Sequence, residues 1–263
     1  MESTYHIELK DFYSEISDTA KHLWEKGWAE RNGGNISRVI PRSISQTPLA
    51  CTKEHIALEE PLPGLANRIV LMTGTGTRMR DVASNPQGNI SIVAITEDGS
   101  EYMLLSSDIP PTSELPSHLR IHNFLQLNRE NYNAIVHSHP TNVVAMSHLK
   151  NFSDSKHFCN ILWKMIPETY VFLPTGIALL PYLMPGSNKV ADASVNAFSQ
   201  GPDVIIWAKH GAFAIAPDTN DAFDKIDLIE KSASIYLAAK STGEEPEGLS
   251  DEDIKELKKF YNL

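Results

Sequence analysis

The chain has 263 residues, and its 23 Lys and Arg against 33 Asp and Glu give a net charge of −10 at pH 7 with His neutral. That acidic balance excludes proteins that bind nucleic acid or an anionic membrane through a basic surplus, whereas 41% hydrophobic and 21% charged residues are typical of a globular protein. Two widely separated cysteines without a CxxC motif, and the lack of a long apolar stretch, lead us to expect a cytoplasmic protein without a disulfide framework.

The first half of the chain predicts one long helix followed by short strands. Phe12, Ile16 and Ala20 recur at helical spacing, so about residues 8–29 form an amphipathic helix, which ends at the glycines of residues 32–35. The later elements are, in chain order, strands at 68–73 and 90–96, a hairpin turn at 97–100, a strand at 102–105 and a helix from its cap Ser113 to about 128.

The second half alternates more regularly between strands and helices. The predicted elements are a strand at 134–139, a helix at 142–149, strands at 170–173 and 176–180, a helix at 187–200, strands at 203–207 and 212–216, and helices at about 219–241 and from residue 250. Ser250 and Asp253 have capping-box spacing. The strands are too short and hairpin-like for a doubly wound sheet, so we expect an α/β fold of the α+β type, with a central, mainly antiparallel sheet flanked by helices.

Three histidines stand at the ends of predicted strands. His137 and His139 are alternate residues, which point to one face of a strand, so both imidazoles can converge on one ion. His210 directly follows another buried run. Taken singly, each is as well interpreted as an ordinary polar residue of a strand end or turn. Together they predict a three-histidine site with an open fourth position, where zinc acts as a Lewis acid.

A glutamate and two further histidines lie in the helix predicted after residue 113. Glu114 stands at the helix start, where the helix dipole favours a carboxylate, so it is either a capping residue or a general base beside a metal. His118 and His122 are four residues apart, which is also a zinc spacing. They lack a matching third ligand, and we interpret them as a surface or structural pair.

Two loops are rich in small hydrogen-bond donors. Residues 32–35 read Asn-Gly-Gly-Asn and residues 73–77 read Thr-Gly-Thr-Gly-Thr. Glycine lets backbone N–H groups approach an anion, while Asn and Thr add side-chain donors, so both loops can bind a phosphate. Neither loop matches a P-loop or a dinucleotide-binding motif. Considered separately, each loop is better interpreted as a plain turn.

Six segments together resemble one known family. They are, in chain order, ERNGGN (30–35), MTGTG (72–76), PTSELPSH (111–118), HSHPTN (137–142), PETYVFLPTG (167–176) and KHGAF (209–213). In this order they resemble the class II aldolases, over about residues 10–240. The resemblance implies a class II aldolase-like three-layer fold, a single domain over residues 1–263, and an aldol cleavage without a Schiff-base lysine.

The resemblance implies retro-aldol cleavage of L-rhamnulose 1-phosphate into dihydroxyacetone phosphate and L-lactaldehyde. It implies one Zn2+ per subunit, held by His137, His139 and His210, whose charge stabilises the ene-diolate formed on cleavage. It also implies that Glu114 protonates the ene-diolate carbon and that Glu168 of a neighbouring subunit handles the proton of the aldehyde-side O4. The residues implied for phosphate binding are Asn32, Gly34, Asn35, Thr75, Thr112 and Ser113.

Members of the family form cyclic tetramers, so the resemblance implies a homotetramer with active sites near the subunit interfaces. One alternative keeps the fold and metal but acts on fuculose phosphate, or epimerises ribulose phosphate. The ERNGGN and PTSELP segments, with the later PETYV segment, favour rhamnulose phosphate. Another alternative is a non-catalytic aldolase-like module, which should have lost its metal ligands, whereas all three histidines and Glu114 are present.

Overall fold

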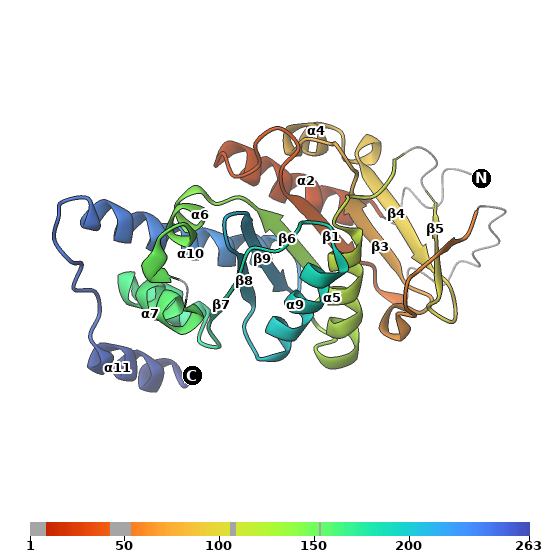
Figure 1. Cartoon of the computed structure of the whole chain (residues 1–263). Helices are drawn as coiled ribbons and strands as arrows, with labels where there is room; N and C mark the ends of the chain where they lie inside the picture. The colour runs from red at the N-terminus through yellow and green to blue at the C-terminus, as the bar shows by residue number, and fades with distance from the viewer. Residues whose placement is uncertain (1–8, 43–53, 106–108, 153) are drawn as a thin grey trace.

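A mixed sheet of nine strands runs through the molecule (Figure 1). The computed structural model describes residues 9–42, 54–105, 109–152 and 154–263, so Cys51 lies outside the described residues. The strands are β1 (Asn35–Val39), β2 (Ile56–Ala57), β3 (Ile69–Thr73), β4 (Ile90–Ile95), β5 (Glu101–Leu104), β6 (Ala134–Ser138), β7 (Ile177–Leu180), β8 (Val204–Trp207) and β9 (Gly211–Ala216). Their order is β2-β5-β4-β3-β1-β6-β9-β8-β7. Every neighbouring pair is antiparallel except β7 and β8, which confirms the expected mainly antiparallel sheet.

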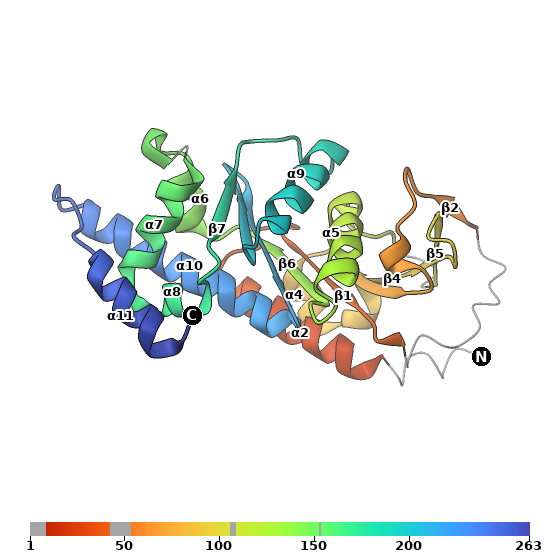
Figure 2. The same cartoon turned by 90° about the horizontal axis from the view of Figure 1, so that it is seen from below.

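Helices cover both faces of this sheet. They are α2 (Lys10–Glu25), α4 (Met79–Ser84), α5 (Leu115–Asn128), α6 (Thr141–Ser147), α7 (Ser155–Met165), α8 (Pro167–Phe172), α9 (Asn188–Ser199), α10 (Thr219–Lys240) and α11 (Asp251–Tyr261), with single 3-10 turns at Pro63–Leu65, Pro86–Gly88 and Lys150–Phe152. Figure 2 shows α2, α4 and α10 on one face and α5 and α9 on the other. The result is the three-layer arrangement that the sequence predicts.

Alternate residues of β6 divide the core into two layers. Val136 packs in the large apolar cluster that includes α2 and α10, whereas Ile135 packs in a second cluster with α5 and α9. Because side chains alternate along a strand, His137 lies on the same face as Ile135. The register pairs Asn35 with His137 and Ser37 with Ile135. These polar side chains of β1 and β6 therefore all face α5.

Most of the predicted elements are confirmed, with shifted ends. The helix predicted over residues 8–29 is α2, which ends at Glu25, and the predicted hairpin of residues 90–105 is formed by β4 and β5. The sequence patterns do not predict β1, because polar residues interrupt its apolar ones. In the structure the side chains of Asn35 and Ser37 are buried, so their polarity marks an internal hydrogen-bond network rather than a loop.

Two parts of the second half differ from the predictions. Residues 170–173 are not a strand but belong mostly to α8, which begins at Pro167, a residue well suited to the first turn of a helix. Tyr170 packs against Trp163 of α7 instead of pairing in the sheet. The patterns also do not predict α7, although the Asp154 carboxylate caps it by accepting the N–H of His157. Helix α7 packs against α10 and strand β7, and α8 packs against α7, α10 and α11. A short apolar run does not distinguish such burial from that of a strand.

The first residues of α11 confirm one predicted helix cap, and those of α5 correct another. The capping box at α11 is confirmed, since Ser250 and Asp253 accept each other's backbone N–H. At α5 the capping position belongs to Glu114 and not to Ser113, and the Glu114 side chain makes no capping hydrogen bond. The interpretation of Glu114 as a capping carboxylate is therefore wrong, and its oxygens are available for other contacts.

A buried carboxylate fixes the start of α6, directly after His139. Glu230 of α10 is 6% exposed and accepts the backbone N–H groups of Asn142 and Val143. We expect Glu230→Ala to leave these donors unpaired and to lower the free energy of unfolding by about 1–3 kcal/mol or more. Urea unfolding measures the change, with the exposed Glu244→Ala as the control. Equal stability of the two variants would contradict this role.

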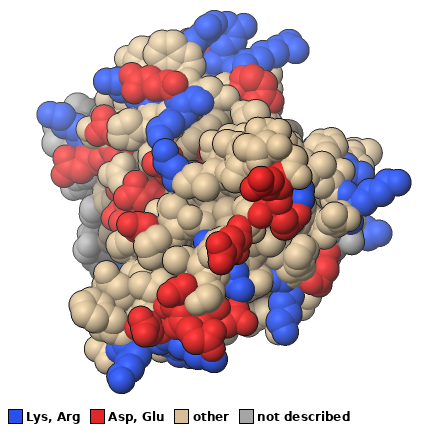
Figure 3. All heavy atoms as spheres, turned by 90° about the vertical axis from the view of Figure 1, so that its left-hand side faces the viewer, with Lys and Arg blue, Asp and Glu red and all other residues tan. Residues whose placement is uncertain are grey.

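Charged side chains of both signs are interspersed on the face at the α7 and α11 end of the molecule (Figure 3). Helix α11 itself carries Asp251, Glu252 and Asp253 in its first turn and Lys258 and Lys259 in its last. This face therefore offers no continuous basic surface to a nucleic acid. Within the described ranges, no helix is long and apolar enough to cross a membrane.

Candidate metal centre and substrate cavity

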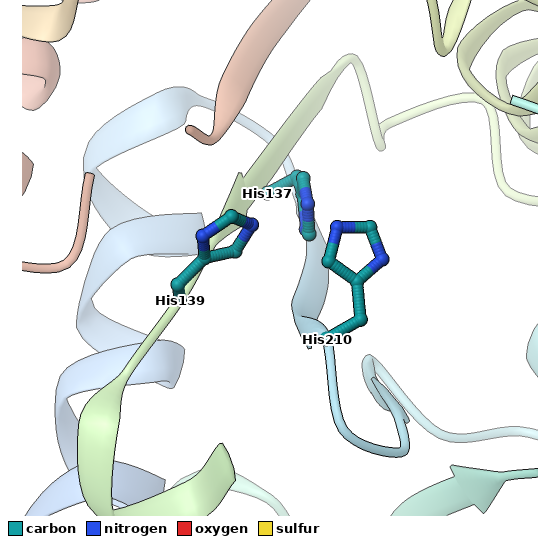
Figure 4. A group of neighbouring side chains, drawn as sticks. All are labelled: His137, His139 and His210. Carbon is teal, nitrogen blue, oxygen red and sulfur yellow. The ribbon is translucent and has the colours of Figure 1, made fainter. Parts of the chain in front are cut away.

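Three histidines meet at one end of the sheet (Figure 4). His137 lies in β6, His139 follows that strand, and His210 lies in the tight turn between β8 and β9. Strand β6 pairs with β9, so the turn places His210 beside the end of β6. One ring nitrogen from each histidine lies within 4.8 Å of one from each of the others. The structure thus brings together the three ligands that the sequence predicts.

The hydrogen bonds of these rings orient them for a metal ion. Nδ1 of His137 lies 2.9 Å from the carbonyl oxygen of Ala212, and Nδ1 of His139 lies 2.7 Å from a carboxylate oxygen of Glu30. Both acceptors require the proton on Nδ1, which leaves an Nε2 lone pair for a metal. Nε2 of His137 and Nε2 of His139 are buried with no hydrogen-bond partner among the described residues, and the ring of His210 turns its Nε2 towards them (Figure 4). Unpaired buried nitrogens in a three-imidazole set fit a bound metal ion.

Burial keeps the imidazoles of His137 and His210 neutral, which is the form that binds metals. Burial and the neighbouring His139 lower the pKa of His137 well below its usual value. The same two causes lower the pKa of His210 to about 4. Near neutral pH both rings therefore present lone pairs rather than positive charges.

A cavity of about 120 Å³ lies against the histidines. Besides these rings, it is lined by Asn32, Gly33, Gly34, Asn35, Gly74, Thr75, Gly76, Thr112, Ser113 and Glu114. The loop after β3 reaches the segment before α5 through backbone hydrogen bonds, from Thr75 N to Pro110 O and from Thr112 N to Thr73 O. Every residue predicted for the site except Glu168 therefore lines one cavity.

Glu114 is buried between this cavity and α5. Its Oε2 accepts the side-chain N–H of Asn35 at 2.8 Å and lies 3.6 Å from Nε2 of His137. Its Oε1 lies 3.8 Å from Nε2 of His210. Burial raises the pKa of Glu114, and the hydrogen bond from Asn35 partly opposes that shift. A carboxylate with a raised pKa beside a metal site is suited to proton transfer.

Comparison with known proteins assigns the family. Residues 14–237 match the family model of the class II aldolase and adducin N-terminal domain. The chain belongs to this class II aldolase family. The match spans all the cavity residues, from Asn32 to His210.

The relatives of this class II aldolase resemble it over nearly their full length. A rhamnulose-1-phosphate aldolase of Bacteroides thetaiotaomicron is 41% identical, over 95% of this chain and 94% of the relative. A rhamnulose-1-phosphate aldolase of Listeria welshimeri is 33% identical, over 98% and 95%. Among solved structures, a sugar-phosphate aldolase from Thermotoga maritima has a TM-score of 0.79 at 31% identity, covering 91% of this chain and 99% of that one.

Glu168 of this class II aldolase lies apart from the cavity. It is exposed in the first turn of α8, a helix that packs on α7, α10 and α11. The cavity lining within one chain does not include it. A role for Glu168 from a neighbouring subunit stays a prediction.

Three glycines let two segments of the chain approach the histidines closely. A Cβ at Gly33 would lie 2.9 Å from the His139 ring, and a Cβ at Gly34 would lie 2.8 Å from the His137 carbonyl oxygen. At Gly211 a Cβ would lie 2.8 Å from both the His137 and His139 rings. Gly34 also has a φ of +73°, which favours glycine. The class II aldolase site therefore depends on the absence of side chains at these positions.

We expect Gly211→Ala to displace the metal-binding rings. The added methyl group would overpack the site at a cost of about 1–3 kcal/mol and would weaken metal binding by roughly 10- to 100-fold. Metal titration and thermal unfolding measure the two effects. Gly88→Ala is the control, because its Cβ meets only the exposed Asn85 side chain. Unchanged metal affinity in Gly211→Ala would contradict the close packing.

Sequence reasoning missed several residues that support the site. Glu30 lies within the ERNGGN segment, but only the structure shows it bonded to His139. Phe213 and Trp207 pack on the His137 ring, with centroid distances of 4.2 Å and 5.4 Å. The sequence indicated these two residues only through their position in strands predicted to be buried. His118 and His122, interpreted as a surface or structural pair, are both fully buried, so they are a structural pair and not a surface pair.

Proposed function

We propose that this class II aldolase is an aldehyde-lyase that cleaves L-rhamnulose 1-phosphate into dihydroxyacetone phosphate and L-lactaldehyde. The observation that carries the proposal is the cavity that joins three histidines and Glu114 to two loops of neutral donors. The Bacteroides thetaiotaomicron and Listeria welshimeri relatives, both named for this activity, support the substrate.

The metal that we propose is zinc, one ion per chain, held by His137, His139 and His210. Three neutral imidazoles with an open fourth position are the donor set of catalytic zinc sites. When bound, zinc supplies positive charge that stabilises the negative charge developing at the substrate C2 and C3 oxygens. The chain's own residues then have to hold the phosphate and move two protons.

Cleavage of the C3–C4 bond requires one proton to leave and one to arrive. The proton of the O4 hydroxyl leaves as the aldehyde forms, and the bonding electrons remain on C3. We assign the new proton on C3 to Glu114, because its carboxyl group lines the cavity beside His137 and His210. We assign removal of the O4 proton to Glu168 of a neighbouring subunit, in keeping with its exposed position on α8.

Neutral groups bind the phosphate in this proposal. The glycine-rich loop after α2, the loop after β3 and the start of α5 line one cavity, and backbone N–H and hydroxyl groups can hold a dianion through several hydrogen bonds. Local donors of this kind make a basic patch unnecessary in a chain of net charge −10. The proposed phosphate ligands are Asn32, Gly34, Asn35, Thr75, Thr112 and Ser113.

We further propose a cytoplasmic homotetramer in which residues 1–263 form one catalytic domain and the active sites lie near subunit interfaces. The single continuous sheet of the described residues supports one domain. Glu168 of α8 is absent from the cavity lining of the single chain, so its proposed role requires a site completed by a neighbour. Sedimentation of the purified protein measures the assembly.

A substrate panel tests the proposed reaction. Zinc-loaded protein is given rhamnulose 1-phosphate, fuculose 1-phosphate and ribulose 5-phosphate, and the release of triose phosphate is measured. We expect the highest kcat/KM with rhamnulose 1-phosphate and no release by protein treated with a chelator. Equal or greater turnover of fuculose 1-phosphate would overturn the substrate assignment, and no triose phosphate from any of the three would overturn the aldolase activity.

A further inference from the structure

A line of buried polar side chains leads away from Glu114, between β1 and α5. The Asn35 amide nitrogen donates to Oε2 of Glu114 at 2.8 Å, and the amide oxygen accepts from Nε2 of His118. The Ser37 hydroxyl then bridges Nδ1 of His118, at 2.6 Å, and Nε2 of His122, at 2.7 Å. Ser37, His118 and His122 are fully buried and lie outside the cavity lining. They are thus placed to act on Glu114 without touching the substrate.

The register of the sheet and the repeat of the helix bring this line together. Asn35 and Ser37 are alternate residues of β1, so their side chains point to the same face of the sheet. His118 and His122 are four residues apart on α5, so they lie on one face of that helix. Where the two faces meet, the Ser37 hydroxyl lies between the two imidazoles. The space between the two histidines is therefore occupied by a hydroxyl group.

Donor and acceptor chemistry allows one arrangement while Glu114 is ionised. A carboxylate only accepts, so Asn35 must turn its NH2 group to Glu114 and its oxygen to His118. Nε2 of His118 must then carry the proton, and its Nδ1 accepts from the Ser37 hydroxyl. The oxygen of that hydroxyl accepts in turn from the Nε2–H of His122. Each group fixes the orientation of the next.

Burial supports neutral imidazoles in this line. It lowers the pKa of His118 to about 3. Burial, with nearby His118 and Arg38, also lowers the pKa of His122 far below its usual value. Each ring therefore has one N–H and one lone pair, as the arrangement requires. Nδ1 of His122 has no hydrogen-bond partner among the described residues, so the line ends there.

We propose that His118 is a positioning residue for Glu114, which it orients through Asn35, and that Ser37 and His122 fix the tautomer of His118. The inference rests on the proposed function only in giving Glu114 the proton transfer. Without the His118 N–H, the Asn35 amide can turn its oxygen towards the carboxylate, and repulsion between two acceptors moves Glu114. With the His118 N–H in place, Oε2 of Glu114 stays bound to Asn35 while its Oε1 faces His210.

Two substitutions of His118 separate positioning from packing. His118→Met fills a similar volume without a donor, whereas the side-chain amide of His118→Gln keeps an N–H for Asn35. We expect His118→Met to lower kcat for rhamnulose 1-phosphate roughly 10- to 100-fold, the cost of a small misplacement, with KM changed by less than about threefold. We expect His118→Gln to restore most of kcat. Wild-type kcat in His118→Met would overturn the inference.

The same substitution in a Glu114→Ala chain tests whether His118 acts through Glu114. We expect no further loss of kcat there, because a positioning residue has no effect once its target is absent. An equal fold-loss in both backgrounds would overturn the inference. Thr19→Val, which removes a buried hydrogen bond to Thr219 between α2 and α10, is the control for a general loss of stability. We expect it to leave kcat unchanged.

Nitrogen NMR of the histidines gives a readout that does not depend on the reaction. We expect 15N shifts of neutral Nε2–H tautomers for His118 and His122, assigned by the loss of each signal in His118→Gln and His122→Gln. A proton on Nδ1 of His118 would overturn the inference whatever the activity. If wild-type protein released no triose phosphate, the proposed function would fail, and the spectra would still decide the hydrogen-bond order.

Discussion

We expect replacement of His210 with Ala to remove the metal ion that we propose, together with the cleavage activity. Two imidazoles hold the ion poorly, and the lost ring is one of three whose nitrogens lie within 4.8 Å of one another. We expect metal affinity to fall by more than about 100-fold, the upper end of the loss caused by removing a supporting residue. Elemental analysis after dialysis measures the metal per chain, and the substrate assay measures the activity.

The matched control for this experiment is His148→Ala. His148 is exposed at the end of α6 and lies outside the histidine cluster. We expect this variant to keep both metal and activity. One metal ion per chain retained in His210→Ala would show that the ion is held elsewhere, and the three-histidine site would be rejected.

We expect Glu114→Gln to keep the proposed metal ion and to lose most of the activity. The amide has the shape of the carboxyl group and can still accept from Asn35, but it cannot deliver a proton to carbon. We expect kcat to fall by about 10²- to 10⁴-fold, the contribution of a positioned proton-transfer group. Exchange of the C3 proton of dihydroxyacetone phosphate with D2O, followed by NMR, measures the proton transfer without the cleavage step.

Glu101→Gln is the control, because Glu101 is a surface carboxylate that pairs with His55. We expect it to leave both kcat and proton exchange unchanged. If Glu114→Gln were fully active, Glu114 would have no part in the reaction. If it lost the metal as well, its main role would be to support the ligands rather than to move a proton.

The sequence predicts the three-histidine cluster because its signal is local. His137 and His139 are two residues apart on a strand, and His210 follows a run of buried apolar residues, so their spacing indicates that they can meet, and the resemblance to the class II aldolases implies that they bind a metal. The same local reasoning fails at residues 170–173, where an apolar run packs against α7 instead of in the sheet. Short apolar runs carry no information about which element they will meet.

The line of buried polar side chains that leads from Glu114 to His122 could not be predicted in this way. Asn35 and Ser37 interrupt the apolar pattern of β1, and His118 and His122 resemble an isolated zinc spacing. Their meaning depends on β1 lying under α5, a contact between residues 81 and 85 positions apart in the sequence. Polar residues buried by tertiary contacts are therefore visible only when the strand order is known.

The support of His139 by Glu30 and of the following helix by Glu230 has a consequence for folding. The two contacts join residues 109 and 88 positions apart, so they form only when both ends of the chain have reached the sheet. Contacts of such long range slow folding. A metal ion that binds only the folded state, present at 100 times its dissociation constant, would raise the free energy of unfolding by about 2.7 kcal/mol. Folding and metal binding are thus coupled, and we expect the midpoint temperature of thermal unfolding to rise with metal concentration.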